Sequence, residues 1–332
     1  MIAAVATAIP TTFLELRDLP APEPAEGELI LEVQACGICG TDLHILDGES
    51  YRPETPFVLG HEPVGRVVAA GSTADRAWLG RTVTVTLFTG CGTCYVCRAG
   101  DERLCPDLKS ITGVLSAPGG FAERLLVRTA HVVEVPDSLS PVETAGLVDA
   151  GATAANSVRV LGRDPDGPLV VVGAGPVGFL AAELATAKGW EVSVVQRSAA
   201  RRGSLEALGY AVAESLADVM VRPTAVIDAA GSPPILPWAL EALAPHGIFV
   251  AAAYGPLDPL TLAPVARKEL RVVGVRSGSR SDLIGVLAAA ASGTIRLPQA
   301  TVWPLAEINA AFAALRGKTV AGKAVIVPPA PS

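Results

Sequence analysis

Four cysteines stand close together in the chain. Cys91, Cys94, Cys97 and Cys105 are separated by two, two and seven residues, in a stretch rich in glycine and polar side chains. Four thiolates complete the tetrahedral shell of zinc and leave no open position, so this spacing predicts a structural zinc site. A zinc ribbon that binds nucleic acid also uses four cysteines. The formal net charge of -7 argues against that partner, because phosphate binding needs a basic face.

A second set of metal-ligating residue types lies in the segments CGICGTDLH and GHE. Cys39 and His61 are suitable zinc ligands, but two protein ligands are too few. Glu62 is a candidate third ligand. Because neighbours on a regular strand face opposite ways, His61 and Glu62 can share a metal only if the backbone at 60–63 is irregular. The alternative for each residue alone is a buried cysteine or a core histidine.

The distribution of cysteines and apolar residues bounds the class of protein. All six cysteines lie between Cys36 and Cys105, and clustering of this kind is more typical of metal binding than of disulfides. The first ten residues contain no Lys or Arg, so a signal peptide is not expected. No apolar run reaches the roughly 20 residues that span a bilayer. We therefore expect a soluble, cytoplasmic protein with no membrane partner.

A glycine motif, G-x-G-x-x-G, follows an apolar run of strand type. Gly173 allows a tight turn, Gly175 lets the backbone approach a pyrophosphate, and Gly178 lets the next helix pack closely on the strand. Pro176 and Val177 lie within the motif as further cofactor-binding candidates, and the N-terminus of the helix that follows attracts phosphate charge. Strand, loop and helix together predict a dinucleotide site. The alternative is a glycine-rich turn that binds no ligand.

The next apolar strand ends at Gln196, about 20 residues beyond the glycines. An NAD site usually has Asp or Glu at this point, which accepts a hydrogen bond from the ribose 2′-OH. Here Arg197, Ser198 and Arg201 follow a neutral glutamine. Guanidinium and hydroxyl groups suit a 2′-phosphate, which a carboxylate would repel. This pattern favours NADP over NAD, and the alternative is that the arginines are solvated at the start of a helix.

The order of the elements predicts an α/β protein of about two domains in 332 residues. Residues 1–137 contain short β-type runs broken by Gly and Pro, typical of an irregular β-barrel. Over 138–276, apolar strands alternate with helical stretches, which indicates a doubly wound parallel sheet. Residues 277–332 differ again, with an amphipathic helix expected over 307–315. Strands are expected at 169–172, 192–195, 225–227, 248–252, 270–275 and 324–327.

Taken together, these motifs resemble those of the zinc-containing medium-chain dehydrogenase/reductase family, which includes alcohol, polyol and threonine dehydrogenases. CGICGTDLH, LGHEPVG, the four-cysteine loop and VVVGAGPVG occur in the family's order and at about its spacing. The resemblance covers nearly the whole chain. It implies a GroES-like catalytic domain over 1–137 and 277–332, an inserted Rossmann domain over 138–276, and an active site in the cleft between them.

The resemblance also implies a catalytic zinc site. Cys39 and His61 would bind the zinc, with Asp149 as the third protein ligand. Glu62 would bind it in some states, in exchange with water or substrate. Polyol-type members often have Glu-Pro where this chain has Asp149-Ala150, so this ligand position departs from the family pattern.

Other residues would serve the reaction and the cofactor. Thr41 would contact the substrate oxygen, and His44 would form the outer end of a proton relay. Thr153 would lie near the nicotinamide, and Lys323 near the cofactor phosphates.

The implied activity is zinc-dependent hydride transfer between NAD(P) and an alcohol, which is a secondary alcohol, polyol, sugar or amino alcohol. Two alternatives stay open: an NADPH-dependent reductase of activated double bonds with non-catalytic zinc, and a non-enzymatic cofactor-binding protein on the same fold. A homodimer or homotetramer is expected, because the strand at 270–275 is expected at an exposed sheet edge.

Overall fold

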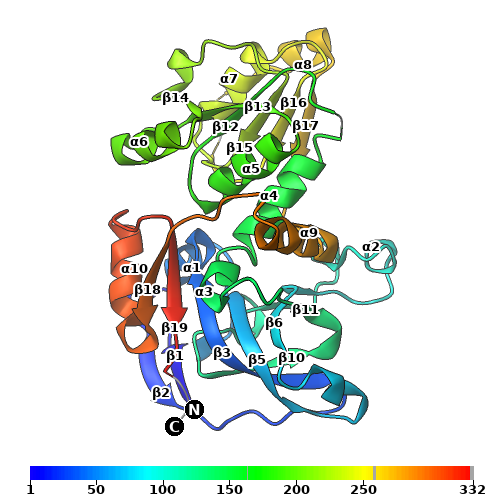
Figure 1. Cartoon of the computed structure of the whole chain (residues 1–332), viewed down its shortest axis with the longest axis vertical. Coiled ribbons are helices and arrows are strands. Elements are labelled where there is room, and N and C mark those ends of the chain that lie inside the picture. The colour runs from blue at the N-terminus through cyan, green and yellow to red at the C-terminus, as the bar shows by residue number, and fades with distance from the viewer. Residues whose placement is uncertain (163, 257–258, 330–332) are drawn as a thin grey trace. The chain divides into compact units, whose positions relative to one another are not determined.

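The computed structural model describes residues 1–162, 164–256 and 259–329. Contacts group the chain into two compact units of different sheet architecture (Figure 1). Unit 1 comprises Met1–Asp149, Ser279–Ala291 and Leu297–Ser332, and unit 2 comprises Ala150–Gly278 and Ser292–Arg296. The change of unit after Asp149 lies twelve residues beyond the boundary expected after residue 137, and the change after Gly278 lies two beyond the one expected after residue 276.

Unit 1 is built around β3 (Glu28–Ile38), the long strand of a seven-stranded sheet. Its pairing with β5 (Glu62–Ala70) shifts register at Ile30/Leu31 and at Val33/Ala35. Such bulges bend a strand, which a barrel-like sheet requires. The other strands of this sheet are β6 (Thr82–Val85), β10 (Arg124–Arg128), β11 (Val132–Glu134), β18 (Ala300–Pro304) and β19 (Lys323–Val327).

Two small sheets and short helices complete unit 1. The first sheet consists of β1 (Ile2–Ala6), β2 (Glu15–Asp18) and β4 (Phe57–Val58), and the second of β7 (Phe88–Thr89), β8 (Ser110–Thr112) and β9 (Ser116–Ala117). The α-helices are α1 (Gly40–Leu46), α2 (Tyr95–Arg98), α3 (Pro141–Ala145), α9 (Arg280–Ala291) and α10 (Ile308–Arg316). Single 3-10 turns occupy Ala74–Trp78, Glu102–Leu104, Thr129–His131 and Leu305–Glu307.

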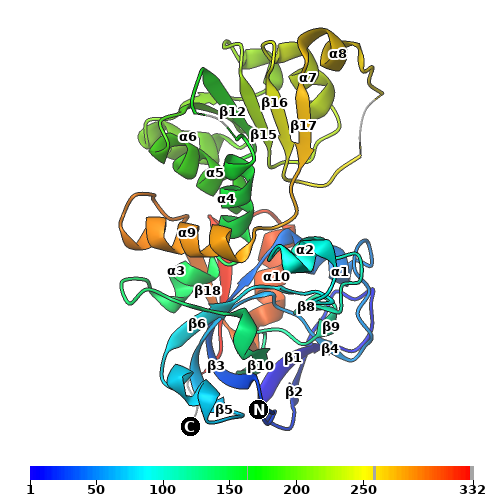
Figure 2. The same cartoon turned by 90° about the vertical axis from the view of Figure 1, so that its right-hand side faces the viewer.

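Unit 2 contains a six-stranded sheet in which every pair of neighbours is parallel. The strand order is β14-β13-β12-β15-β16-β17, the doubly wound order that binds dinucleotides. Figure 2 shows α5 and α6 on one face of the sheet and α7 and α8 on the other. The strands are β12 (Pro168–Val172), β13 (Glu191–Val195), β14 (Ala211–Ala213), β15 (Ala225–Asp228), β16 (Ile248–Ala251) and β17 (Arg271–Gly274). The helices are α4 (Ala150–Arg159), α5 (Pro176–Ala187), α6 (Ala199–Ala207), the 3-10 turn Leu216–Asp218, α7 (Ile235–Ala242) and α8 (Ala263–Lys268).

The core of unit 2 explains why its strands are so apolar. Val170, Val226 and Phe249 from three adjacent strands pack with Ile235 and Leu240 of α7, and all five are buried. Because helices cover both faces, these strands have no solvent side and no alternation. All six strands expected from the sequence are present, and the helix expected over 307–315 is α10. None of the described helices is long and apolar enough to cross a membrane.

Candidate active site and metal centres

The four-cysteine loop brings its thiols together around α2. The sulfur atoms of Cys91, Cys94, Cys97 and Cys105 all lie within 4.8 Å of one another. Hydrogen bonds, chiefly from Thr93, lower the pKa of Cys91 to about 6, which favours the thiolate. Burial and the three neighbouring sulfurs raise the pKa of Cys97 to about 12, so a bound cation would be needed to stabilise its thiolate. This donor set fits a closed, tetrahedral zinc site.

A second cluster joins four ligand types that are distant in sequence. Single ligand atoms of Cys39, His61, Glu62 and Asp149 lie within 4.8 Å of one another, all in unit 1. Cys39 Sγ is 3.3 Å from His61 Nε2, and that nitrogen is 3.7 Å from Asp149 Oδ2. The structure therefore brings together the four residues expected to bind the catalytic zinc. We call them the mixed cluster.

Glycines give the mixed cluster its local backbone. Gly60 has φ +100°, and a Cβ there would lie 2.7–2.8 Å from the side chain and backbone of Phe121. This left-handed residue supplies the irregularity through which His61, just before β5, and Glu62, its first residue, reach one site. Gly37 makes room for the carboxylate, since a Cβ at Gly37 would overlap Glu62 Oε2. Sequence reasoning did not single out Gly37, although CGICG contains it.

Asp42 supports two ligands at once and was also missed. Its Oδ2 accepts from the Cys39 N–H at 2.9 Å, and its Oδ1 lies 3.1 Å from His61 Nδ1. Asp42 is fully buried in the first turn of α1, where Cys39 is the N-cap. A carboxylate on Nδ1 fixes the ring so that Nε2 faces the metal. The signal available in the sequence was a capping pattern, an acidic residue three positions after a cap.

Lys323 lies beside the mixed cluster and not in unit 2. Its Nζ forms an ion pair with Glu62 Oε2, and the two side chains are 2% and 0% exposed. The sequence did not suggest this pairing with Glu62, and the approach of Lys323 to the cofactor phosphates stays a prediction. Glu62 Oε1 has no hydrogen-bond partner among the residues described. Burial raises the pKa of Glu62 although Lys323 opposes the shift. A cation bound at the unengaged oxygen would stabilise the ionised carboxylate.

The electrostatics of His61 also indicate a cation site. Burial alone would lower the pKa of His61, but Asp42 and Cys39 raise it well above its ordinary value. Negative groups therefore surround the imidazole on both nitrogens and attract positive charge. Sulfur, imidazole and carboxylate together are typical zinc donors, and the mixed cluster fits that ion.

Thr41 and His44 occupy one side of α1. They are three residues apart, so their side chains are neighbours on the helix. The Thr41 N–H donates to Cys39 Sγ at 3.3 Å, which ties the threonine to the mixed cluster. His44 is 60% exposed and its Nδ1 lies 2.8 Å from Glu49 Oε2. The pair thus extends from Cys39 of the mixed cluster to the exposed surface.

In unit 2 the glycine motif has the geometry of a phosphate loop. Gly173 has φ +91°, and a Cβ at Gly178 would overlap the carbonyl oxygen of Gly173. Gly175 is the N-cap of α5, followed by Pro176, and a Cβ there would meet open space. Val177 lies in the same first turn, whose N–H groups are available for an anion.

The residues that follow β13, after the glycine motif, are held in place by hydrogen bonds among themselves and with α6. Gln196 Oε1 accepts from the Ser198 N–H at 3.0 Å. Arg202 donates to the carbonyl oxygens of Gln196 and Arg197 and pairs with Glu214. Arg197 is exposed and Arg201 partly buried, at the start of α6. Thr153 is buried in α4 of the same unit.

Asp228 is a further residue that the sequence did not single out. It ends β15 and accepts hydrogen bonds from the N–H groups of Ala230 and Gly231, both at 2.9 Å. Burial raises its pKa. The turn that it stabilises places Ala230 against Gly173, so Asp228 shapes the backbone next to the phosphate loop.

Comparisons with known proteins agree with this geometry. The model of the alcohol dehydrogenase GroES-like domain matches residues 25–137, and that of the zinc-binding dehydrogenase matches residues 176–292. An alcohol dehydrogenase of Geobacillus stearothermophilus is 30% identical over 94% of this chain and 95% of its own length. The chain belongs to the zinc-containing medium-chain dehydrogenase/reductase family.

Family membership confirms the predicted fold, a GroES-like barrel with a Rossmann sheet, and the predicted class, a zinc-dependent oxidoreductase that uses NAD(P). A cobalt- and zinc-bound alcohol dehydrogenase from Pyrobaculum aerophilum matches 99% of both chains with a TM-score of 0.90 at 27% identity. A putative zinc-binding dehydrogenase from Sinorhizobium meliloti, whose structure holds NADP, has a TM-score of 0.87 at 26% identity. The match covers 98% of the chain described here and 99% of the Sinorhizobium chain.

Proposed function

We propose that this chain transfers a hydride between NADP and a secondary alcohol, polyol, sugar or amino alcohol. The observation that carries the proposal is the mixed cluster, in which four different ligands and two supporting charges, Asp42 and Lys323, meet in a buried site. A cluster built only for stability would not need an exchangeable carboxylate such as Glu62. The four-cysteine loop holds the second zinc of each subunit.

Cys39, His61 and Asp149 would hold the catalytic zinc, and Glu62 would bind it when water or substrate leaves. A zinc ion at this site supplies Lewis acidity, which lowers the pKa of an alcohol hydroxyl. Asp42 holds the His61 ring in place through Nδ1. Lys323 pairs with Glu62 and offsets part of the cost of burying its charge.

The proton of the alcohol leaves along α1. Thr41 contacts the substrate oxygen through its hydroxyl, takes the proton and gives up its own hydroxyl proton, which His44 delivers to solvent. The cofactor supplies the hydride acceptor, and the residues of this chain supply placement and proton transfer. Replacing one such proton-transfer group costs about 10²–10⁴-fold in rate. Thr41→Val keeps the shape and removes the hydroxyl, so its alcohol oxidation tests this path.

The carboxylate ligand supports the substrate class. Asp149 stands where simple alcohol enzymes and polyol enzymes of the family differ, and a carboxylate there favours the polyol, sugar and amino-alcohol group. A sorbitol dehydrogenase of Bacillus subtilis is 34% identical over 182 residues, 54% of this chain. The experiment is a dehydrogenation screen over secondary alcohols, polyols and amino alcohols with each cofactor. Activity confined to unsaturated carbonyl substrates would contradict the proposal.

The choice of NADP rests on the end of β13. Gln196 carries no charge and its Oε1 already accepts from Ser198, so it offers little to a ribose 2′-OH. Arg197 and Ser198 are exposed, and their guanidinium and hydroxyl groups would donate to a 2′-phosphate. A charge-assisted hydrogen bond contributes roughly 1.5–3 kcal/mol, or one to two decades of affinity.

We expect kcat/KM to be at least about tenfold higher with NADP than with NAD. Gln196→Asp combined with Arg197→Ala should reverse the order, because the aspartate accepts from the 2′-OH and repels phosphate. Arg222→Ala is the matched control, since it removes an exposed positive charge elsewhere on unit 2. A wild-type preference for NAD would contradict this part of the proposal.

The subunits associate through β17. This strand is the last of the six-stranded sheet, and Arg271, Val272 and Gly274 are exposed along it. An exposed edge invites pairing with the same strand of a second copy. Light scattering should show a dimer or tetramer, which Val272→Asp weakens. A 33.9 kDa monomer at micromolar concentration would contradict the assembly and leave the reaction untouched.

A further inference from the structure

Glu49, in the loop after α1, contacts His44 at the end of that helix. Glu49 Oε2 lies 2.8 Å from His44 Nδ1, and the Glu49 N–H donates to the His44 carbonyl oxygen, also at 2.8 Å. Side chain and backbone of Glu49 therefore both engage His44. The two side chains are 60% and 63% exposed, as the outer end of a path to solvent must be.

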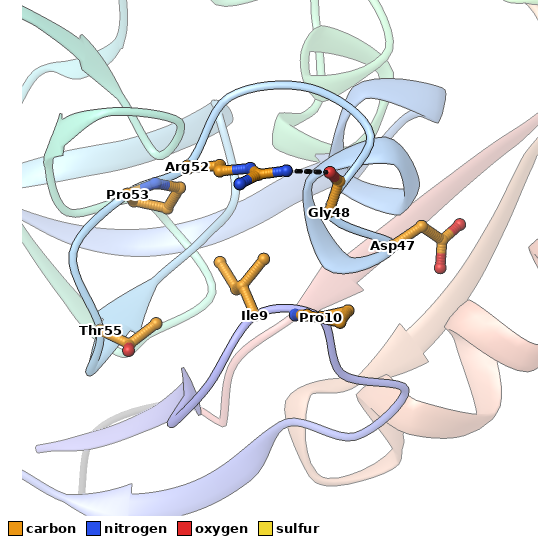
Figure 3. Close-up of a pocket in the computed structure, with 7 residues that line it drawn as sticks. All are labelled: Ile9, Pro10, Asp47, Gly48, Arg52, Pro53 and Thr55. Carbon is orange, nitrogen blue, oxygen red and sulfur yellow. Dashed lines mark hydrogen bonds between the residues drawn. The ribbon is translucent and has the colours of Figure 1, made fainter.

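Two other charged residues of this loop, Asp47 and Arg52, have partners of their own. Asp47 is held by Arg316 of α10, with nitrogen–oxygen distances of 2.6 and 2.9 Å. Arg52 donates to the Gly48 carbonyl oxygen at 3.4 Å, over a cavity of about 350 Å³ between this loop and the turn at Ile9 (Figure 3).

In Figure 3 the Asp47 carboxylate points away from Arg52. Arg316 lowers the pKa of Asp47, with a smaller contribution from His44. Asp47 raises the pKa of Arg316, with a smaller contribution from Glu49. The charged groups facing the pair are thus Asp47 and Arg316. Within the described part of the chain, His44 is the side chain to which the Glu49 carboxylate bonds.

A carboxylate at Nδ1 decides which nitrogen of a neutral imidazole holds the proton. The ring has one N–H, and an acceptor at Nδ1 favours the tautomer with the proton there. Nε2 then carries the lone pair. The same arrangement exists inside the enzyme, where Asp42 faces His61 Nδ1 and Nε2 faces the mixed cluster.

We propose that Glu49 is a positioning residue for the proton relay, which holds His44 with the proton on Nδ1 and Nε2 free to accept. In the oxidation direction, Nε2 takes the proton that the alcohol loses and releases it to water, while the Nδ1 proton stays on the ring. The Glu49 carboxylate, 2.8 Å from Nδ1, stabilises the transient imidazolium. This inference rests on the proposed function, because it requires His44 to end the relay.

The test is a double-mutant cycle on kcat/KM for alcohol oxidation, measured from pH 5.5 to 9.5. Glu49→Ala should lower kcat/KM roughly two- to fivefold near neutral pH, the size expected of an exposed charge pair. The loss should shrink at high pH, where solvent replaces the relay. In the His44→Ala background, Glu49→Ala should have no further effect, because it acts through the imidazole. Glu49→Asp should restore part of the rate.

Glu54→Ala is the matched control, since Glu54 is an exposed glutamate of the same loop. It should leave kcat/KM and its pH profile unchanged. Equal losses from Glu49→Ala with and without His44 would overturn the inference, as would a Glu49→Ala variant with wild-type kcat/KM. If His44→Ala itself lost nothing, the relay and this inference would both fall. Zinc-dependent turnover, tested separately at Cys39, would stand.

Discussion

The four-cysteine loop takes all its ligands from residues 91–105, whereas the mixed cluster takes Cys39, His61, Glu62 and Asp149 from three separate segments. The first set consists of four thiols in one loop, three of them partly buried and one buried. The second is chemically mixed and is supported by Asp42 and Lys323, both fully or nearly fully buried. A structural zinc site, closed by four protein ligands, needs only the right spacing of those ligands in the chain. A catalytic site with an open position also needs neighbouring residues that keep its ligands charged and oriented.

The largest expected effect is the loss of turnover on removal of a mixed-cluster ligand. Cys39→Ala should reduce alcohol oxidation to background, because substrate binding at zinc is lost with the metal. NADP binding should stay close to wild type, since the glycine motif belongs to unit 2. Steady-state assays and fluorescence titration with NADPH measure the two properties. Loss of both alcohol oxidation and NADP binding would show that Cys39→Ala is misfolded. His61→Ala would then serve as the test of the mixed cluster.

Removal of a four-cysteine ligand should act in the opposite way. Cys94→Ser should release one zinc per subunit and lower Tm by about 5–10 °C, because structural zinc contributes folding free energy. Residual folded enzyme should keep its kcat. Thermal melts with elemental analysis provide the measurement. Unchanged zinc content and Tm would refute the structural site.

A smaller effect is expected from the supporting carboxylate. Asp42→Asn keeps the size of the side chain but removes the charge that faces His61 Nδ1. Outer-shell changes of this kind typically reduce metal affinity or activity by about 10–100-fold. Competition with a zinc-binding dye measures the affinity. A variant with wild-type zinc affinity and kcat would show that Asp42 only caps α1.

Glu183 offers a contrast to Glu62 among buried carboxylates. Glu183 accepts from Tyr210 at 2.6 Å and forms an ion pair with Arg296 at 2.8 Å, all within unit 2. Burial alone would raise its pKa, but these hydrogen bonds lower it below 4.5. A satisfied carboxylate therefore stays charged without a metal, whereas Glu62 has an unengaged oxygen.

Glu183→Gln should lower the free energy of unfolding by about 1.5–3 kcal/mol near neutral pH, the range for hydrogen bonds to a charged group. The pKa of Glu183 is lower in the folded state than in the unfolded state. Its charge therefore stabilises the fold at pH values above the unfolded-state pKa, and this stabilisation disappears as pH falls through the folded-state pKa. The difference in free energy of unfolding between Glu183→Gln and wild type should therefore become smaller below about pH 4.5. Urea melts at several pH values check this, and a constant difference would refute the role of the charge.

The same contrast explains what the sequence can predict. The cysteine spacing, the glycine motif and the positions of the strands along the chain depend on local pattern, and each was predicted. Asp42 and Gly37 lie next to predicted ligands, but their roles depend on how α1 and β3 meet β5. Lys323 comes from the far end of the chain and was given a different partner, because only the pairing of β19 with β3 brings it to Glu62.

Graded chelation with parallel assays of zinc content, turnover and Tm tests the central claim most directly, that the mixed cluster holds the catalytic zinc. The account predicts two zincs per subunit, of which the first to leave belongs to the mixed cluster. Turnover should fall in proportion to its loss and return when zinc is restored, while Tm changes little until the second zinc leaves. Full turnover after loss of the first zinc would contradict the account and favour a reductase whose zinc is not catalytic.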